Sequence, residues 1–192
     1  MIRALYDWTI SLASTRYAMW ALAIVAFVES SVFPIPPDVL LIPMIIAQPR
    51  KAFQIAALCT VCSVLGGLAG YWIGMSLFDL VGRPVLEFYD KYSYFDEFSV
   101  RYKEWGAWAV LIAGVTPFPY KVITITSGAT GLNLTVFIVA SIVARGLRFF
   151  IVAALLWKFG APIREFIEKR LGLMFALFCI LLVGGFYVIR FL

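Results

Sequence analysis

Two proline-rich stretches interrupt long apolar segments, and this pattern is the strongest constraint on the fold. The first stretch, VFPIPPDVLLI, begins at Val32, and the second, VTPFPYKVITI, begins at Val115. A proline inside a helix removes a backbone donor and clashes with the preceding turn. We therefore expect both stretches to break a helix. The residues assigned to this role are Pro34, Pro36, Pro37, Pro117 and Pro119.

The segments around the breaks are apolar enough to need lipid as their solvent. Of the 192 residues, 63% are hydrophobic and 14% are charged, and the mean hydropathy is +0.95. A soluble domain is usually about half apolar and about a quarter charged. Residues 52–78 contain no charged side chain and exceed the roughly 20 residues that a membrane-spanning helix needs. The sequence therefore predicts an all-α integral membrane protein.

The apolar pieces beside the first break are individually too short to cross a bilayer. They cover residues 18–28 and 39–47. Irregular backbone is tolerated at membrane depth only where it faces protein or a water-filled cavity. A helix that enters the membrane, breaks and returns to the same side satisfies both conditions. We expect such a re-entrant helical hairpin at each break.

The two breaks also align with each other without gaps, which indicates an internal repeat. In this alignment Pro34 corresponds to Pro117, and Asp38 corresponds to Lys121. Broken helices at corresponding places in two units are typical of transporters built from repeats. One span separates the two hairpins, so we predict two inverted repeats. The expected divisions are an interfacial segment (1–17), a membrane domain (18–157) with repeats 18–82 and 105–157 joined by a helical connecting segment (83–104), and a C-terminal part (158–192). In this last part a basic loop or interfacial helix (158–170) precedes a C-terminal transmembrane helix.

The span at residues 52–78 carries a ridge of small residues. Gly66, Gly70 and Gly74 are four positions apart and share one helix face. This spacing lets a second helix approach closely, so we assign the three glycines to helix packing. Cys59 and Cys62 lie one turn apart on the same span. A membrane thiol oxidoreductase would need a second pair, and Cys179 is the one cysteine left, so the pair is also interpreted as packing.

Composition narrows the chemistry further. The chain has no histidine, which excludes His-based acid–base catalysis and most zinc sites. We expect no metal, no cofactor and no enzymatic activity. The net charge of +5 comes from Lys and Arg residues that form no dense patch, so we expect them to flank spans and not to bind nucleic acid.

The distribution of these cations also predicts an orientation. With two same-side hairpins, Arg3, Arg16, Arg50, Lys51, Lys158, Arg164, Lys169 and Arg170 share one side of the membrane. Arg83, Lys91, Arg101, Lys103 and Arg190 share the other. The side richer in Lys and Arg is cytoplasmic. We expect a multi-pass protein of the cell membrane, here the bacterial inner membrane, with a cytoplasmic N-terminus.

Five ionisable side chains lie in otherwise apolar surroundings: Glu29, Asp38, Lys121, Arg145 and Arg148. A charge at bilayer depth costs roughly 2.5–3.5 kcal/mol on insertion scales, so these groups must be paired, hydrated or bound to a ligand. One hypothesis is a structural network of buried salt bridges. The other is that the cations bind a phosphate headgroup, for which arginine has a suitable planar fork.

The second hypothesis gives each residue a role. We assign Lys121, Arg145 and Arg148 to substrate binding, with Tyr120 as a further headgroup contact. Glu29 and Asp38 are assigned to proton coupling or gating, because a partly desolvated carboxyl group can take up a proton.

Several motifs together resemble a known family. They are Glu29 followed by F-P-x-P-P-D, the glycine ridge LGGLAGYWIG, the break G-V-x-P-F-P-Y-K and a later A-R-G-L-R-F. This combination resembles the DedA superfamily, which shares a domain with the eukaryotic lipid scramblases of the VTT type. The P-F-P-Y-K break looks more like its YqaA-like branch, and the resemblance covers about residues 18–157.

The resemblance implies a carrier of lipids or lipid carriers, including undecaprenyl phosphate in bacteria. It also implies functional acids in the first hairpin, matched here by Glu29 and Asp38, and functional bases in the second. The better-known members have two arginines around the second-hairpin proline. Thr116 stands at the first of these positions, and Lys121 lies one position before the second, so Arg145 and Arg148 are candidates for the missing positive charge.

The expected function is a transporter or scramblase that moves a phosphate-bearing lipid, such as a polyprenyl phosphate or a phospholipid, between leaflets, with proton coupling as one option. The partner is then a membrane lipid with a phosphate headgroup, and a homo-oligomer remains open. The alternative is a structural or assembly protein whose buried charges hold helices together. An enzyme acting on lipid phosphates is disfavoured, because the sequence offers no nucleophile with a positioned base and no acidic metal cluster.

Overall fold

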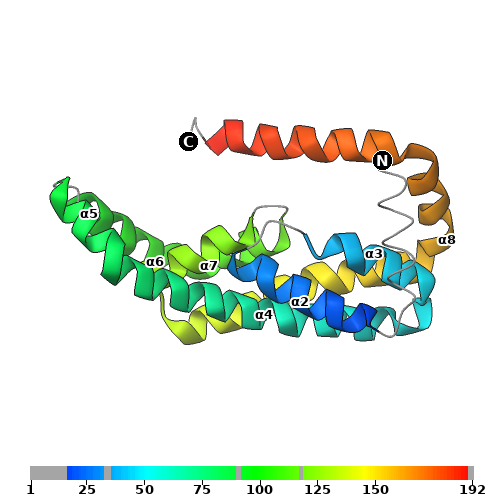
Figure 1. The fold of residues 1–192 in the computed structure, drawn as a ribbon, viewed down its shortest axis with the longest axis horizontal. Helices are drawn as coiled ribbons and strands as arrows, with labels where there is room; N and C mark the ends of the chain where they lie inside the picture. The colour runs from blue at the N-terminus through cyan, green and yellow to red at the C-terminus, as the bar shows by residue number, and fades with distance from the viewer. Residues whose placement is uncertain (1–16, 33–35, 90–91, 117–118, 190–192) are drawn as a thin grey trace.

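The computed structural model describes residues 17–32, 36–89, 92–116 and 119–189, and every regular element within them is helical (Figure 1). The prediction of an all-α protein is confirmed for these residues. The elements are α2 (Ala18–Ser31), α3 (Asp38–Ala47), the 3-10 helix η1 (Pro49–Lys51), α4 (Ala52–Leu77), the π-helix η2 (Phe78–Gly82), α5 (Arg83–Phe88), α6 (Tyr92–Val115), α7 (Tyr120–Ala129) and α8 (Leu134–Ile189).

Helices end and restart at both proline-rich stretches. Helix α2 ends at Ser31 and α3 begins at Asp38, directly after Pro36 and Pro37. Proline is well tolerated just before or within the first turn of a helix, because the donor that it lacks would have no intrahelical partner there. Helix α7 begins in the same way after Pro119. Pro34 and Pro117 lie outside the described residues, and re-entry of the two hairpins into a membrane stays a prediction.

The helices form two units, α2–α4 and α6–α8, and each unit contains one of the two breaks. Within each unit the first helix packs on the long one, α2 on α4 and α6 on α8. The short helices also cross between units: α7 packs on α4, and α3 packs on α8 as well as on α4. The units are therefore interlocked and not simply placed side by side. That they are inverted repeats stays a prediction.

The glycine ridge of α4 is where the two units approach most closely. A Cβ atom added at Gly66 would lie 2.0 Å from the carbonyl oxygen of Phe27 on α2, and one added at Gly74 would lie 2.0 Å from the carbonyl oxygen of Ile125 on α7. At Gly70 it would meet the Thr124 hydroxyl at 2.4 Å. One helix face thus contacts a helix of each unit at backbone distance, which only glycine permits.

Two apolar clusters flank this ridge. One joins α2, α3, the first half of α4 and the middle of α8 through Leu22, Leu41, Ile55 and Phe149. The other joins the second half of α4 to α6, α7 and the start of α8 through Tyr71, Val110, Tyr120, Leu132 and Phe137. Both long helices take part in both clusters and so hold the molecule together along its length (Figure 1).

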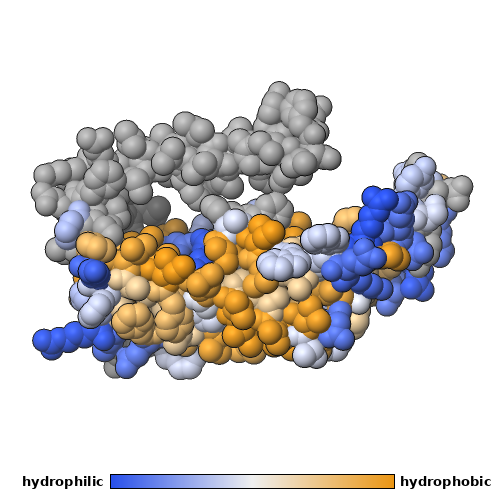
Figure 2. Space-filling model, turned by 180° about the vertical axis from the view of Figure 1, so that it is seen from behind, coloured by the Kyte–Doolittle hydropathy of each residue, from blue (hydrophilic) through white to orange (hydrophobic). Residues whose placement is uncertain are grey.

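The outer surface of the helices is apolar as well. Large side chains such as Trp20, Trp72, Trp108 and Ile142 are more than half or about half exposed, and Figure 2 shows a broad hydrophobic belt between hydrophilic ends. Among the described residues, Pro49–Phe88 and Leu134–Gly160 are long and apolar enough to cross a membrane. Such a belt is the surface that lipid solvates, and it marks a membrane protein.

The two predicted connecting segments are helical in the structure. Residues 158–170, expected as a basic loop or an interfacial helix, belong to α8. Pro162 lies inside this helix, and Figure 1 shows α8 changing direction before its C-terminal part, as a proline within a helix promotes. The described part of the connecting segment 83–104 forms α5 and the start of α6. Residues 1–16 of the expected interfacial segment lie outside the described residues.

Candidate functional site

Arg145 and Glu29 form an ion pair between the two units. Arg145 lies on α8 and Glu29 on α2, and a guanidinium nitrogen of Arg145 (Nη2) donates to Oε2 of Glu29 over 2.8 Å. The side chains are 3% and 14% exposed. Removing such a group from water is unfavourable unless the charge is paired and its remaining donors are hydrogen-bonded.

Arg145 makes further contacts with the surrounding helices. Its Nε donates to the hydroxyl of Ser63 on α4 over 2.6 Å, and Ser63 in turn shares a 2.7 Å hydrogen bond with Ser30 on α2. The guanidinium also stacks 4.6 Å from the centre of the Tyr120 ring and 4.8 Å from that of Phe149. Aromatic faces attract a cation most strongly when it is shielded from water. Arg145 is thus enclosed by side chains from α2, α4, α7 and α8.

Arg148 forms the second ion pair, one turn further along α8. Its Nη2 donates to the Asp38 carboxylate at the start of α3, and its Nη1 donates to the carbonyl oxygen of Thr116 over 2.8 Å. Asp38 follows the first proline break, and Thr116 begins the second. About a fifth of each charged side chain is exposed, 20% for Arg148 and 21% for Asp38. Arg148 therefore links both breaks and remains accessible.

The two pairs have a common arrangement. Both acids belong to the first unit and both arginines to α8 of the second. Residues three apart in a helix lie on the same face, so Arg145 and Arg148 form one basic stripe against α2 and α3. The structure brings four of the five predicted charged residues into two neighbouring pairs. Their pairing explains how the protein accommodates charge within the apolar belt.

Lys121 and Tyr120, the other two predicted binding residues, occupy different surroundings at the start of α7. Lys121 is partly buried, and no acidic group lies within 4.0 Å of its ammonium in the described part of the chain. Tyr120 is fully buried and donates its hydroxyl to Ser141 over 2.5 Å. In this structure Tyr120 supports the Arg145 guanidinium with its ring and has no exposed surface for a headgroup.

The structure adds polar groups that sequence reasoning missed. Ser30, Ser63 and Ser141 are buried and bind the charged or aromatic groups of the site. Ser30 directly follows Glu29, and Ser63 directly follows Cys62. The sequence does contain a signal for these residues, because each is a serine within an apolar stretch. A serine hydroxyl that is buried there needs a hydrogen-bond partner. Thr124 also contributes, because its hydroxyl hydrogen-bonds the Ser30 carbonyl of the other unit over 3.1 Å.

The cysteine pair of α4 lies close to this region, but neither thiol hydrogen-bonds a residue of the two ion pairs. Cys59 is fully buried in the first apolar cluster, and Cys62 packs at its edge, with both thiols free. Within the part of the chain that the structure describes, no group of three Cys, Asp or Glu side chains could hold a metal ion. The chemistry that the site offers is recognition by charge: two arginines whose carboxylate partners another anion could replace.

Comparisons with known proteins identify related sequences. The model of the VTT domain matches residues 35–158. An uncharacterized protein of Haemophilus influenzae (strain ATCC 51907 / DSM 11121 / KW20 / Rd) is 36% identical over 168 residues, which covers 85% of this chain and 87% of the relative. The uncharacterized protein HI0703 homolog of Histophilus somni is 37% identical over 168 residues with the same coverage. No solved structure matches the chain.

Proposed function

This chain belongs to the VTT domain family, the domain of the DedA superfamily, and from that premise we propose that it moves a phosphate-bearing lipid between the leaflets of a membrane. Proteins with this domain are associated with membrane transport or lipid-related roles. The observation that carries the proposal is the pair of contacts that Arg148 makes, one with Asp38 of the first unit and one with Thr116 of its own unit. These contacts join both chain breaks, and Arg148 is still one fifth exposed.

The partial exposure of Arg148 is what a binding group requires. A buried ion pair adds little net stability compared with apolar packing, so stability alone does not account for two such pairs. Arginine binds carboxylate and phosphate with the same planar fork. A lipid phosphate that reaches Arg148 can therefore replace the Asp38 carboxylate. Arg145, which is 3% exposed, would become accessible only when the units separate.

A transport step follows from this exchange. When phosphate occupies Arg148, Asp38 loses its partner, and α3 loses one of its ties to α8. Asp38 can then take up a proton, which removes an unpaired charge from the apolar belt. Lys121, at the start of α7, supplies a further cation beside the second break. Return of the proton and re-formation of the Arg148–Asp38 pair would release the lipid on the other side.

The experiment is a lipid-translocation assay in proteoliposomes. The purified protein is reconstituted with a phosphate-bearing lipid, and the rate of appearance in the opposite leaflet is compared for the wild type, Arg148→Ala and Glu29→Ala. We expect both variants to lower the rate at least about tenfold, which is the change for losing about 1.4 kcal/mol of binding to the transported state. Wild-type rates in both variants would reject the site.

The structural alternative is supported by the arrangement of the four charges, which form two ion pairs, and by the further hydrogen bond from Arg145 to Ser63. It predicts that apolar packing can replace the charges. The combined variant Glu29→Met with Arg145→Met removes both members of one pair. If this variant is stable and transports lipid at the wild-type rate, the pair only holds helices together. A stable variant without transport supports the carrier.

The setting of this activity is part of the same proposal. The protein acts as a carrier and not as an enzyme, in the bacterial inner membrane, with its N-terminus in the cytoplasm. Support comes from the unequal distribution of Lys and Arg along the sequence. Labelling of single cysteines introduced at Arg50 and Arg101 tests the orientation. Labelling of both from the same side of the membrane contradicts it.

A further inference from the structure

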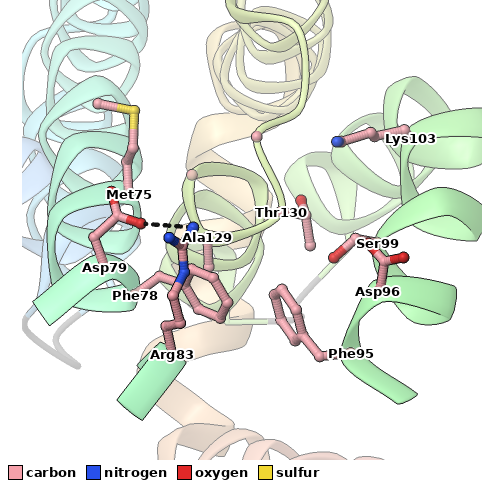
Figure 3. Close-up of a pocket in the computed structure, with 12 residues that line it drawn as sticks. Met75, Phe78, Asp79, Arg83, Phe95, Asp96, Ser99, Lys103, Ala129 and Thr130 are labelled. Atoms are coloured by element: carbon pink, nitrogen blue, oxygen red, sulfur yellow. Dashed lines mark ion pairs between the residues drawn. The ribbon is translucent and has the colours of Figure 1, made fainter. Parts of the chain in front are cut away.

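A polar pocket lies at the end of the molecule away from the ion pairs. It has a volume of about 260 Å³ and is formed by the π-helix η2, the first half of α6 and the turn between α7 and α8 (Figure 3). Its lining includes Asp79, Arg83, Asp96, Ser99, Lys103 and Thr130. Sites for drug-sized ligands measure about 300–1,000 Å³, so the pocket is suited to a small group rather than a whole lipid.

The wall of the pocket contains a buried hydroxyl without a partner. Ser99 is 6% exposed, and its Oγ is the one buried side-chain polar atom in the described residues that has no hydrogen bond. A serine in a helix can usually bond a carbonyl of the preceding turn, and burial without any partner is unfavourable. In Figure 3 the Ser99 hydroxyl and the Lys103 ammonium both point toward the Thr130 side of the pocket. The hydroxyl is therefore available to a ligand there.

The charges around the pocket are balanced but not fully paired. Asp79 and Arg83 form an exposed ion pair at 3.4 Å on one side. On the α6 side, neither Asp96 nor Lys103 has an oppositely charged partner within 4.0 Å among the described residues. A simple anion would be attracted by Lys103 and Arg83 but repelled by the two aspartates. A ligand carrying both signs of charge meets a partner for each.

The backbone on the third side of the pocket is held rigidly. Helix α7 ends at Ala129 and is followed by Gly131 at φ +65°, and the Gly131 and Leu132 amides bond back to the carbonyls of Gly128 and Ser127. This is the glycine C-cap arrangement known as the Schellman motif. The Tyr71 hydroxyl fixes the turn further by donating to the Leu132 carbonyl over 2.6 Å. Thr130 and Gly131 are thus held in place beside the pocket before a ligand binds.

From these contacts we infer that the pocket binds a small zwitterionic group with a phosphate and an ammonium, such as the headgroup of an ethanolamine phospholipid. Lys103, Arg83 and the Ser99 hydroxyl face the phosphate, and Asp96 faces the ammonium. The pocket lies at the hydrophilic end of the apolar belt, where Figure 2 shows the α5–α6 end in blue, which is the depth of lipid headgroups. The inference does not depend on transport and can hold if the proposed function fails.

The test measures the binding of soluble O-phosphoethanolamine to the full-length protein in detergent. Binding is detected from changes in the NMR signals of the ligand as the ligand is titrated. Inorganic phosphate and ethanolamine serve as probes that each carry only one sign of charge. We expect O-phosphoethanolamine to bind more tightly than either probe. Equal binding of inorganic phosphate would overturn the inference, because the aspartates would then contribute nothing. Absence of binding by all three would overturn it as well.

Matched variants identify the residues. Lys103→Gln and Arg101→Gln remove the same charge two positions apart on α6, but Arg101 pairs with Glu97 and does not line the pocket. We expect Lys103→Gln to weaken binding about tenfold, as loss of one charge-assisted hydrogen bond does, and Arg101→Gln to leave it unchanged. Ser99→Ala should also weaken binding while keeping the fold, since its hydroxyl has no partner in the protein. Equal affinities in all three variants would contradict the assignment.

A final comparison identifies the source of the ligand. The titration is repeated in nanodiscs of an ethanolamine phospholipid and in nanodiscs of a glycerol phospholipid. If the pocket takes a lipid headgroup, the ethanolamine lipid occupies it and the soluble ligand no longer binds. If the pocket takes a free metabolite of the same chemistry, both nanodiscs give the same titration. Asp96→Asn, with Glu104→Gln as its control, should abolish the preference for the zwitterion in either case.

Discussion

Arg148 and Asp38 lie 110 positions apart in the chain and form an ion pair between α8 and the first residue of α3. The same guanidinium donates to the carbonyl of Thr116, at the end of α6. One side chain therefore joins the two places where proline interrupts the helices, and both interruptions are tied to a single helix.

The dual contact of Arg148 predicts a difference between two substitutions. Arg148→Ala removes both bonds and should lower the free energy of unfolding by about 2 kcal/mol. Arg148→Lys keeps the charge but not the planar fork, so it should keep part of the stability and lose most of the transport. Thermal unfolding in detergent and the proteoliposome assay measure the two effects. Arg101→Ala, which breaks an exposed pair on α6, is the control. Equal transport by the Lys and wild-type proteins would contradict the role of the fork.

The close approach at the glycine ridge predicts that α4 tolerates no side chain at two positions. Gly66→Ala and Gly74→Ala each place a Cβ atom 2.0 Å from a backbone carbonyl oxygen, so α2 or α7 must move away. We expect each to destabilise the protein by about 1–3 kcal/mol, the usual range for overpacking. Gly160→Ala on α8 meets nothing within 4 Å and should be neutral or slightly stabilising. Similar melting temperatures for all three would show that the ridge is not in contact.

The position of Lys121 predicts a separation of transport from stability. Its ammonium has no acidic partner in the described residues, so Lys121→Gln should leave the melting temperature within about 1 °C of wild type, the shift expected of a surface-like change. If the ammonium contacts lipid phosphate, the same variant should transport several-fold more slowly. Lys158→Gln, an exposed change within α8, is the control. A slow but also unstable Lys121→Gln would assign the residue to folding instead.

Tyr120 distinguishes a headgroup contact from support of Arg145. Tyr120→Phe removes the hydrogen bond to Ser141 and keeps the ring beneath the guanidinium. If Tyr120 only supports Arg145, Tyr120→Phe should lower the free energy of unfolding by about 1 kcal/mol, because the hydrogen bond is lost. Transport should be retained. Loss of transport without loss of stability would restore the prediction, made from sequence, that its hydroxyl touches the substrate.

The features that depended on local chemistry could be read from the sequence. The proline stretches indicate where α3 and α7 begin, because Pro36, Pro37 and Pro119 restrict the backbone wherever they lie. The spacing of Gly66, Gly70 and Gly74 indicates a contact face, because helical periodicity places them together. Neither statement requires knowledge of any distant partner.

The pairing of charges could not be read in this way. Alignment of the two breaks makes Asp38 and Lys121 equivalent positions, and the sequence sets two acids against three cations without saying which of them pair. In the structure Asp38 pairs with Arg148. The partner of a charge depends on how α8 crosses α3, which residues more than 100 positions away determine. The form of residues 158–170 was left open between a basic loop and an interfacial helix for a related reason, because local composition is compatible with both; the structure continues α8 through this stretch.

The crossing of α3 onto α8 and of α7 onto α4 has a consequence for how the chain can be divided. Each half lends a helix to the other, so a fragment ending near residue 90 would expose the ridge face that α7 covers.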